Sequence, residues 1–562
     1  MPEIKIGNYL FTRLKQLGVS TVFSVPGDYE LALLDLIGDS GVEFAGNPNE
    51  LIAAYAADGY SRLKGVGAWV DTYGPGELSS YCGQAGQYTE LVPVAHVVGY
   101  PGRDAMRGHM VMHHTLGTSE FDMFEKMASQ ISATTTVLLN PKTTAAEIDR
   151  CLTTMLQESR PVYIGVPVDM SHLTCDSSGL DKPIHGELPP NEPELEKGVV
   201  GDLRMLLEQK KSPIFIVDGN ACRNYVTEEC GMLAKLTGLL TFTTSMGRGG
   251  IDEELPNFGG VCSGLGSYKE VREAVEGSDA VFWIGNFPSD FNTGEFTEKV
   301  GVDVAVDFQR FFVKIGAKKF LLKMKYLLRA LIKSLEDKPL ARTSTAKVDW
   351  DPYPLANIEK SPKLTQDYLW AATSSSARPV PPPYGISASK LPTTASMFNQ
   401  TVFGSIGYAT GAIVGAAKAI KENKAYRRCI LVTGEGSLQL TAQAFADMLK
   451  LELNPYRLSD CISRIILNSA ATPWNAIHGK DAPYNKVGEW DYSLLAKTFG
   501  PAFPSKYWGQ IDTCEGLEEV FADKEFNEGE MCRVLELKLG YLDAPANILA
   551  LGPAIDGFNR KK

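Results

Sequence analysis

A glycine-rich turn with one acidic residue, Gly434-Glu435-Gly436-Ser437, follows the apolar run 429–433 and precedes a helical pattern over 442–451. Where a strand leads into a helix in this way, free backbone N–H groups and the positive end of the helix dipole face the sheet edge at which phosphates bind. Gly434 and Gly436 allow close backbone approach, and Glu435 can bind a cation that bridges two phosphates. The segment indicates a phosphate and magnesium site, but such turns also occur for purely structural reasons.

Further polar residues along the chain can transfer protons. Asp28 follows a predicted strand at 21–23, where it also suits the N-cap of the next helix. Glu50 opens a predicted helix, a position at which a glutamate usually stabilises the helix dipole. His113 and His114 are adjacent with no third ligand nearby in sequence, so they are poor metal candidates on their own. Two more motifs are Gly404-Ser405-Ile406-Gly407 and Asn468, which ends a predicted strand.

Together and in this order, these motifs resemble the thiamine diphosphate enzymes, and most closely the pyruvate decarboxylase family. The resemblance runs from about residue 9 to residue 543 and includes Asn47-Pro48-Asn49-Glu50-Leu51 and His113-His114-Thr115-Leu116-Gly117. It implies thiamine diphosphate and Mg²⁺ as cofactors. It also implies a carbon–carbon lyase that decarboxylates a 2-oxo acid, pyruvate first among substrates, to an aldehyde and CO₂ without oxidation.

The resemblance assigns a role to each motif. Glu50 hydrogen-bonds a ring nitrogen of the cofactor's pyrimidine, and Asp28, His113 and His114 handle protons and the substrate carboxylate. Ile406 is the bulky residue over which the cofactor bends. The implied cofactor-binding residues are Glu50, Gly404, Ser405, Ile406, Gly436 and Ser437, and the implied metal ligands are Glu435, Asn468 and Ser469.

The match breaks in the third part of the chain. Glu435 replaces an aspartate, and Ser469 replaces an asparagine whose amide oxygen binds a cation better than a hydroxyl does. Trp474 stands in place of a catalytic glutamate, a loss that typically costs about 10²–10⁴-fold in rate. The segments 371–400 and 455–476 differ most. They indicate either a repurposed site or a gene model with misplaced exon boundaries.

Two alternative functions therefore stay open. Without the proton donor replaced by Trp474, the enzyme could join the acyl carbanion to a second carbonyl. Alternatively, the chain could be a catalytically silent subunit, because family active sites lie between the first domain of one chain and the third domain of its partner. The resemblance implies a homodimer or homotetramer with active sites between chains.

The elements that must position these residues alternate between strand and helix along the whole chain. This predicts an α/β fold with three doubly wound parallel-sheet domains. We expect a pyrimidine-binding domain at 1–185, a central scaffold domain at 196–345 and a diphosphate- and magnesium-binding domain at 360–562. The central domain carries no G-x-G-x-x-G pattern after its strands, so no dinucleotide site is indicated.

The composition sets broader limits. With 562 residues, 44% of them hydrophobic and a net charge of −12, the chain is typical of a globular protein and shows no signal for nucleic-acid binding. Its basic stretch, 318–333, predicts an amphipathic surface helix. Ten cysteines without metal-ligand spacing fit a reducing cytosol. No signal region or membrane-length apolar run is present, so a cytoplasmic protein without membrane or nucleic-acid partners is expected.

Overall fold

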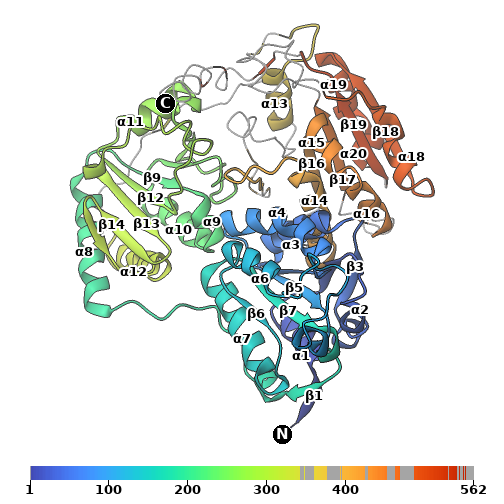
Figure 1. Cartoon of the computed structure of the whole chain (residues 1–562). Coiled ribbons are helices and arrows are strands. Elements are labelled where there is room, and N and C mark those ends of the chain that lie inside the picture. Colours follow the sequence, from blue (N-terminus) through green and yellow to red (C-terminus); the bar gives the residue numbers. More distant parts are fainter. Residues whose placement is uncertain are drawn as a thin grey trace.

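The structure is a computed structural model of the chain (Figure 1). It describes residues 2–341, 347–348, 358, 360–375, 391, 393, 395, 397–424, 428–451, 453, 462–468, 487–528, 531–540, 543–544, 549 and 551. These residues form three sheets of six, seven and four strands, with helices packed around them, and one separate two-stranded ribbon. The predicted α/β class with three sheet domains is confirmed. The exact domain boundaries stay a prediction.

The first sheet has the strand order β3-β2-β4-β5-β7-β6, and every neighbouring pair is parallel. The central strands β4, β5 and β7 are buried along their full lengths, as expected for a parallel sheet covered on both faces. The strands are β2 (Thr21–Ser24), β3 (Glu43–Gly46), β4 (Gly67–Thr72), β5 (Val94–Tyr100), β6 (Thr135–Val137) and β7 (Val162–Pro167).

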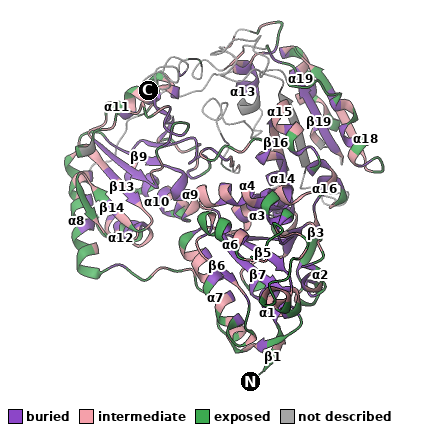
Figure 2. Ribbon diagram, viewed as in Figure 1, coloured by how far each residue is buried: buried purple, intermediate pink, exposed green. Residues whose placement is uncertain are grey.

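Two pairs of helices cover this sheet. α1 (Ile6–Gln16) and α7 (Pro141–Glu158) enclose an apolar core on one face. α3 (Glu50–Lys64) and α4 (Pro75–Thr89) lie on the other face. Beside α1, the ribbon pairs β1 (Glu3–Lys5) antiparallel with β8 (Thr174–Asp176). Figure 2 shows buried strands between helices whose outer faces are exposed.

The second sheet has the order β11-β10-β9-β12-β13-β14-β15, of which the last two pairings are antiparallel. Its strands are β9 (Pro213–Val217), β10 (Thr241–Thr243), β11 (Phe258–Val261), β12 (Ala280–Ile284), β13 (Ala305–Gln309), β14 (Phe312–Ile315) and β15 (Lys318–Phe320). Its main helices are α8 (Pro193–Gln209), α9 (Gly219–Arg223), α10 (Thr227–Thr237), α11 (Lys269–Glu276) and α12 (Met324–Asp337).

The basic stretch 318–333 differs from the predicted single helix. Its first residues form strand β15, and only α12 is helical. Leu327, Leu328 and Leu331 of α12 are fully buried, because the apolar stripe of this helix packs into the second core. Only the polar side of α12 is therefore left for the basic residues.

The third sheet is parallel, with the order β16-β17-β19-β18. The strands are β16 (Arg428–Gly434), β17 (Ile462–Asn468), β18 (Ser505–Ile511) and β19 (Cys532–Leu537). The helices are α13 (Gln366–Ser375), α14 (Tyr408–Asn423), α15 (Glu435–Thr441), α16 (Ala444–Lys450), α18 (Leu495–Phe499), α19 (Cys514–Ala522) and α20 (Lys524–Glu528). The helix expected at 442–451 thus begins earlier, at Glu435, and is divided into α15 and α16.

The first and third sheets are joined by α3 and α14, which lie against each other in Figure 1. Glycines allow their backbones to touch: a Cβ on Gly415 would lie 1.7 Å from the Ala56 carbonyl oxygen, and one on Gly59 would lie 1.9 Å from that of Ala412. One apolar core includes residues from both sides of this contact. None of the helices in the described part of the chain combines the length and apolar character needed to cross a membrane.

Candidate active site

The order in which strands are added to the first sheet reverses between β2 and β4, although the strands all run parallel. The chain passes from β2 to β3 on one side and returns to β4 on the other, so the carboxyl ends of β2 and β4 form a topological switch point. Ligands of open α/β sheets bind at such points. Asp28 follows β2 and Glu50 begins α3 directly after β3, so the fold brings both carboxylates to this edge.

Neither carboxylate caps a helix. α3 is capped by Asn49, whose side-chain oxygen accepts a hydrogen bond from the backbone N–H of Ile52 at 2.8 Å. The segment after Asp28 is helical only at α2 (Leu31–Leu34), and no side chain caps it. Asp28 instead contacts His113: its Oδ2 lies 2.5 Å from Nε2 of the ring. The interpretation of Asp28 as an N-cap is therefore wrong.

Asp28, His113 and His114 form one cluster, in which one ligand atom from each lies within 4.8 Å of the others. The fold thus places a carboxylate next to the two histidines, a third group that the sequence spacing does not reveal. Tyr29 stacks on the His113 ring with centroids 4.7 Å apart and its hydroxyl lies 3.2 Å from Nδ1. About half of each of the Asp28 and His113 side chains is exposed. This pair can exchange a proton with a ligand.

His114 is held in an uncommon conformation. Its φ is 67°, in the left-handed region that a residue with a side chain rarely adopts. Gly74 makes room for it, because a Cβ on Gly74 would lie 2.1 Å from the His114 carbonyl oxygen. The Nδ1 atom of His114 is buried and has no hydrogen-bond partner among the described residues. The His114 ring thus keeps one hydrogen-bonding atom that the described residues do not use.

Glu50 is partly buried, and burial together with the nearby Asp71 carboxylate raises the pKa of its carboxyl. A Cβ on Gly76 would lie 3.3 Å from Glu50 Oε1, so the absence of a side chain there leaves space for the carboxylate. A carboxyl group with a raised pKa can retain a proton and share it with a ring nitrogen. These features fit a pyrimidine at this position.

The segment 404–407 is fixed between the first and third sheets. The Tyr55 hydroxyl donates a hydrogen bond to Ser405 Oγ at 2.7 Å, and the Gly407 N–H donates to Ser437 Oγ at 2.9 Å. Gly404 and Gly407 have φ values of 62° and 93°, which favour glycine. Ile406 at the tip of this segment is 65% exposed. The fold therefore brings Gly404, Ser405 and Ile406 together with Ser437.

The predicted metal ligands approach the edge of the third sheet. β16 ends at Gly434, α15 starts at Glu435, and Gly434 pairs in register with Asn468 at the end of β17. Burial raises the pKa of Glu435. For Asn468 only the backbone is described. Ser469 and Trp474 lie outside the described residues.

Among the described residues, these two groups make no polar contact with each other. In the described part of the structure, no hydrogen bond or ion pair joins Asp28, Glu50, His113 or His114 to the residues at 404–406, 435–437 or 468. The two regions are joined by other residues: the Asn47 side-chain amide donates to Asp447 Oδ2 at 2.7 Å, and α3 packs against α14. Ile406 and Leu440, which are 65% and 59% exposed, leave an apolar surface beside the phosphate-side residues.

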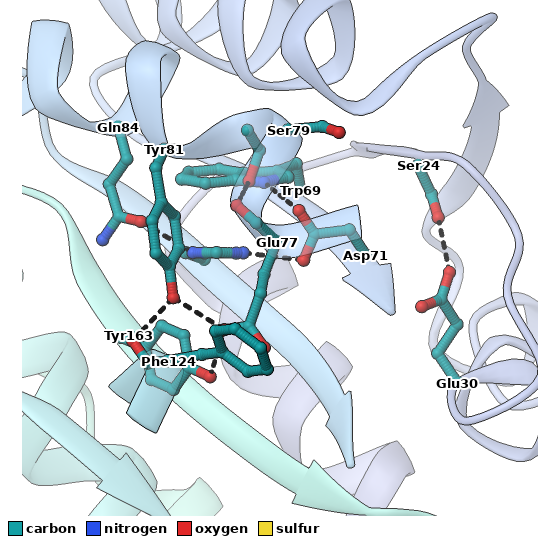
Figure 3. Close-up of polar contacts among 12 residues, drawn as sticks. Ser24, Glu30, Trp69, Asp71, Glu77, Ser79, Tyr81, Gln84, Phe124 and Tyr163 are labelled. Atoms are coloured by element: carbon teal, nitrogen blue, oxygen red, sulfur yellow. Dashed lines mark hydrogen bonds and ion pairs between the residues drawn. The ribbon is translucent and has the colours of Figure 1, made fainter. Parts of the chain in front are cut away.

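The structure contains a buried polar group around Asp71 that the sequence did not predict (Figure 3). Asp71 lies at the end of β4, and His96 lies in β5; both side chains are fully buried and 2.7 Å apart. Glu77 accepts hydrogen bonds from the Tyr81 and Tyr163 hydroxyls, both at 2.8 Å. The sequence did offer a signal, because each of two apolar runs contains one ionisable residue: Asp71 in 68–72 and His96 in 94–98.

Comparison with known proteins covers the whole chain. Three family models match it: "Thiamine pyrophosphate enzyme, N-terminal TPP binding domain" over residues 4–123, the "central domain" over 200–315 and the "C-terminal TPP binding domain" over 385–458. Pyruvate decarboxylase isozyme 3 of Saccharomyces cerevisiae and pyruvate decarboxylase of Kluyveromyces lactis are each 38% identical to it, with 100% of both chains covered.

A solved structure has the same fold. The thiamine diphosphate-dependent 4-hydroxybenzoylformate decarboxylase of Rhodococcus jostii RHA1 superposes with a TM-score of 0.75, covering 96% of this chain and 100% of that one. The two sequences are 17% identical.

Proposed function

The chain belongs to the thiamine pyrophosphate enzymes and, within them, to the pyruvate decarboxylase family of 2-oxo acid decarboxylases, and from this premise we propose that it decarboxylates pyruvate to acetaldehyde and CO₂ with thiamine diphosphate and Mg²⁺. Pyruvate is favoured because the relatives that match over their full lengths are pyruvate decarboxylases. The single observation that carries the proposal is the Asp28–His113–His114 cluster beside Glu50, at the switch point of the first sheet.

When bound, thiamine diphosphate supplies a thiazolium ring that accepts the electron pair released as CO₂ leaves. Glu50 would hold the pyrimidine and share its proton with a ring nitrogen. Its half-buried position and raised pKa support this role.

The Asp28 carboxylate and the His113 ring would deliver and remove protons at the reacting carbon. Their 2.5 Å contact lets one proton pass between them, and their exposure gives a substrate access. The His114 ring, which belongs to the same cluster, would bind the substrate carboxylate or its proton. Because Trp474 stands where the family has a glutamate, these three groups would carry the proton transfers in this chain.

At the other edge, Glu435, Asn468 and Ser469 would hold Mg²⁺, with Gly436 and Ser437 close to the diphosphate. The in-register pairing of Gly434 with Asn468 supports this arrangement. Gly404, Ser405 and Ile406 would support the rings of the cofactor. Carboxylate, amide and hydroxyl oxygens are suitable ligands for a hard cation.

A complete site would require two copies of the chain. Among the described residues, no polar contact joins the two groups within one chain, and Ile406 and Leu440 present exposed apolar surface on the phosphate side. The first-sheet edge of a partner copy would cover that surface. We therefore assign a homodimer or a homotetramer.

The test is calorimetric titration of the purified protein with thiamine diphosphate and Mg²⁺, followed by pyruvate and coupled detection of aldehyde. Binding followed by aldehyde release is the expected result, and Glu50→Gln should remove it. Asp104→Asn, a change at a side chain that is 96% exposed, is the matched surface control. Binding without aldehyde release from any 2-oxo acid would refute the decarboxylase assignment.

Trp474 favours a second candidate, carboligation, because loss of a proton donor lengthens the life of the acyl carbanion. A hydroxyketone as the main product would support it. A catalytically silent subunit predicts no cofactor binding by this chain alone, but activity in a mixed assembly with an active relative.

A further inference from the structure

Behind Glu50 lies a buried carboxylate that the proposed function does not use. Asp71 is fully buried at the carboxyl end of β4. A carboxylate in such a place costs several kcal/mol unless it is compensated. Two groups compensate it: the Trp69 indole N–H donates to Oδ2 at 3.1 Å, and His96 Nε2 lies 2.7 Å from Oδ1. Figure 3 shows Trp69 and Asp71 side by side on β4.

The hydrogen bonds around His96 define how many protons the pair holds. Ser132 Oγ donates to the Ala128 carbonyl at 2.8 Å and therefore accepts from Gln84 Nε2 at 2.7 Å. This orients the Gln84 amide so that its oxygen accepts the Nδ1 proton of His96 at 2.8 Å. Nε2 then shares one proton with Asp71. The pair is neutral overall, whichever of the two atoms holds that proton.

The surroundings favour the ionic form of the pair. The Trp69 ring stacks on His96 with centroids 4.2 Å apart and an interplanar angle of 13°. An aromatic face stabilises a cation more than a neutral ring. Trp69 also donates a hydrogen bond to Asp71, which stabilises the carboxylate. The negative end of the pair is therefore Asp71.

Asp71 and Glu50 meet at Gly76. A Cβ placed on Gly76 would lie 3.3 Å from Glu50 Oε1 and 3.6 Å from Asp71 Cβ. The nearby negative charge of Asp71 adds to burial in raising the pKa of Glu50. Because Gly76 has no side chain, residue 76 places no group between Glu50 and Asp71.

Two other carboxyl groups belong to the same region. Burial raises the pKa of Glu30 to about 9, with Asp71 and Glu50 adding to the effect, so Glu30 is neutral at pH 7 and brings no competing charge. Glu77 on α4 is held by the Gly74 N–H, Tyr81 and Tyr163. Burial raises the pKa of Glu77 to about 8. Among the described residues, Asp71 is the carboxyl group that lies across Gly76 from Glu50, and His96 is hydrogen-bonded to it.

We propose that Asp71 is a positioning residue for Glu50: the His96–Asp71 pair places a carboxylate beside the Glu50 carboxyl, across Gly76, and so helps to keep a proton there for the nitrogen acceptor of the cofactor. This inference rests on the proposed function and extends it to residues that touch neither cofactor nor substrate. It predicts that the pair controls the upper pH limit of cofactor binding.

The first test is the pH dependence of the Kd for thiamine diphosphate, with Mg²⁺ present, in the wild type, Asp71→Asn and Asp104→Asn. Asp71→Asn removes the charge and keeps the shape, so Glu50 should lose its proton at a lower pH. We expect the weakening of the Kd with rising pH to begin at a lower pH in Asp71→Asn, and the Kd to be roughly three- to tenfold weaker than that of the wild type above that point. Asp104→Asn, the exposed surface change, is the matched control, and its Kd profile across pH should equal that of the wild type.

The second test needs no cofactor. A double-mutant cycle of Asp71→Asn with Glu50→Gln, followed by thermal unfolding of the apoprotein from pH 5 to pH 9, measures the coupling between the two carboxyls. We expect the shifts in Tm to be non-additive at pH 9 and additive at pH 5. Additive shifts at both pH values, or an unchanged Kd profile in Asp71→Asn, would overturn the inference. If the wild type fails to bind thiamine diphosphate, the proposed function fails, and the apoprotein cycle alone decides the inference.

Discussion

Replacement of Gly415 by alanine tests the junction of α3 and α14. The new Cβ would lie 1.7 Å from the Ala56 carbonyl oxygen, whereas real contacts of this kind are essentially never under 3.0 Å. To reach that distance, the two backbones must separate by about 1.3 Å. Such a shift reduces dispersion contacts along the whole interface, and overpacking of this kind costs about 1–3 kcal/mol or more.

The same substitution also has a favourable part. Alanine is better than glycine in a helix interior by about 1 kcal/mol. Gly201 on α8 isolates that part, because it is exposed and nothing lies within 4 Å of its Cβ position. We therefore expect Gly201→Ala to stabilise the protein by up to about 1 kcal/mol. Gly415→Ala should still destabilise it, by up to about 2 kcal/mol net of that gain.

Thermal unfolding at fixed pH and protein concentration is the assay. A loss of this size should lower the Tm by up to about 8 °C, and Gly201→Ala should leave it unchanged or raise it. Because Glu50 begins α3 and Ser405 directly precedes α14, Gly415→Ala should also weaken binding of thiamine diphosphate. Equal Tm increases in both variants would show that α3 and α14 are not in backbone contact.

Three further outcomes follow from the structure. Burial raises the pKa of Asp447 from 3.8 to about 7, so its ionisation destabilises the fold as pH rises through that interval. Asp447→Asn should therefore increase the free energy of unfolding by up to about 4 kcal/mol at pH 8 and leave it unchanged at pH 4, as measured by unfolding across pH. His113→Gln should lower kcat for decarboxylation by about 10²-fold or more with little change in cofactor Kd, because it removes the ring that shares a proton with Asp28. Dialysis against a chelator should abolish thiamine diphosphate binding, and added Mg²⁺ should restore binding in the wild type but not in Glu435→Ala. Full binding without a divalent cation would contradict the role of Glu435.

The strand–helix alternation was sufficient to predict the fold class, because each buried parallel strand is an apolar run followed by a polar turn. It could not predict that Asp28 bonds His113, since 85 positions separate them and only the sheet order brings them together. The same holds for Asp71 and His96. Their partnership depends on the register in which β4 pairs with β5, and the sequence pattern does not specify register. Ser469 and Trp474 stay predictions, because the described residues do not include them.

The core shared by α3 and α14 has a consequence for how the protein melts. Phe23, Ile52 and Trp69 of the first sheet region belong to the same apolar cluster as Val414, Leu431 and Phe445 of the third. The cores around the second sheet contain residues of that region alone among their buried members. Calorimetry should therefore resolve two cooperative units instead of three, and amide hydrogen exchange should show α3 and α14 opening with the same free energy.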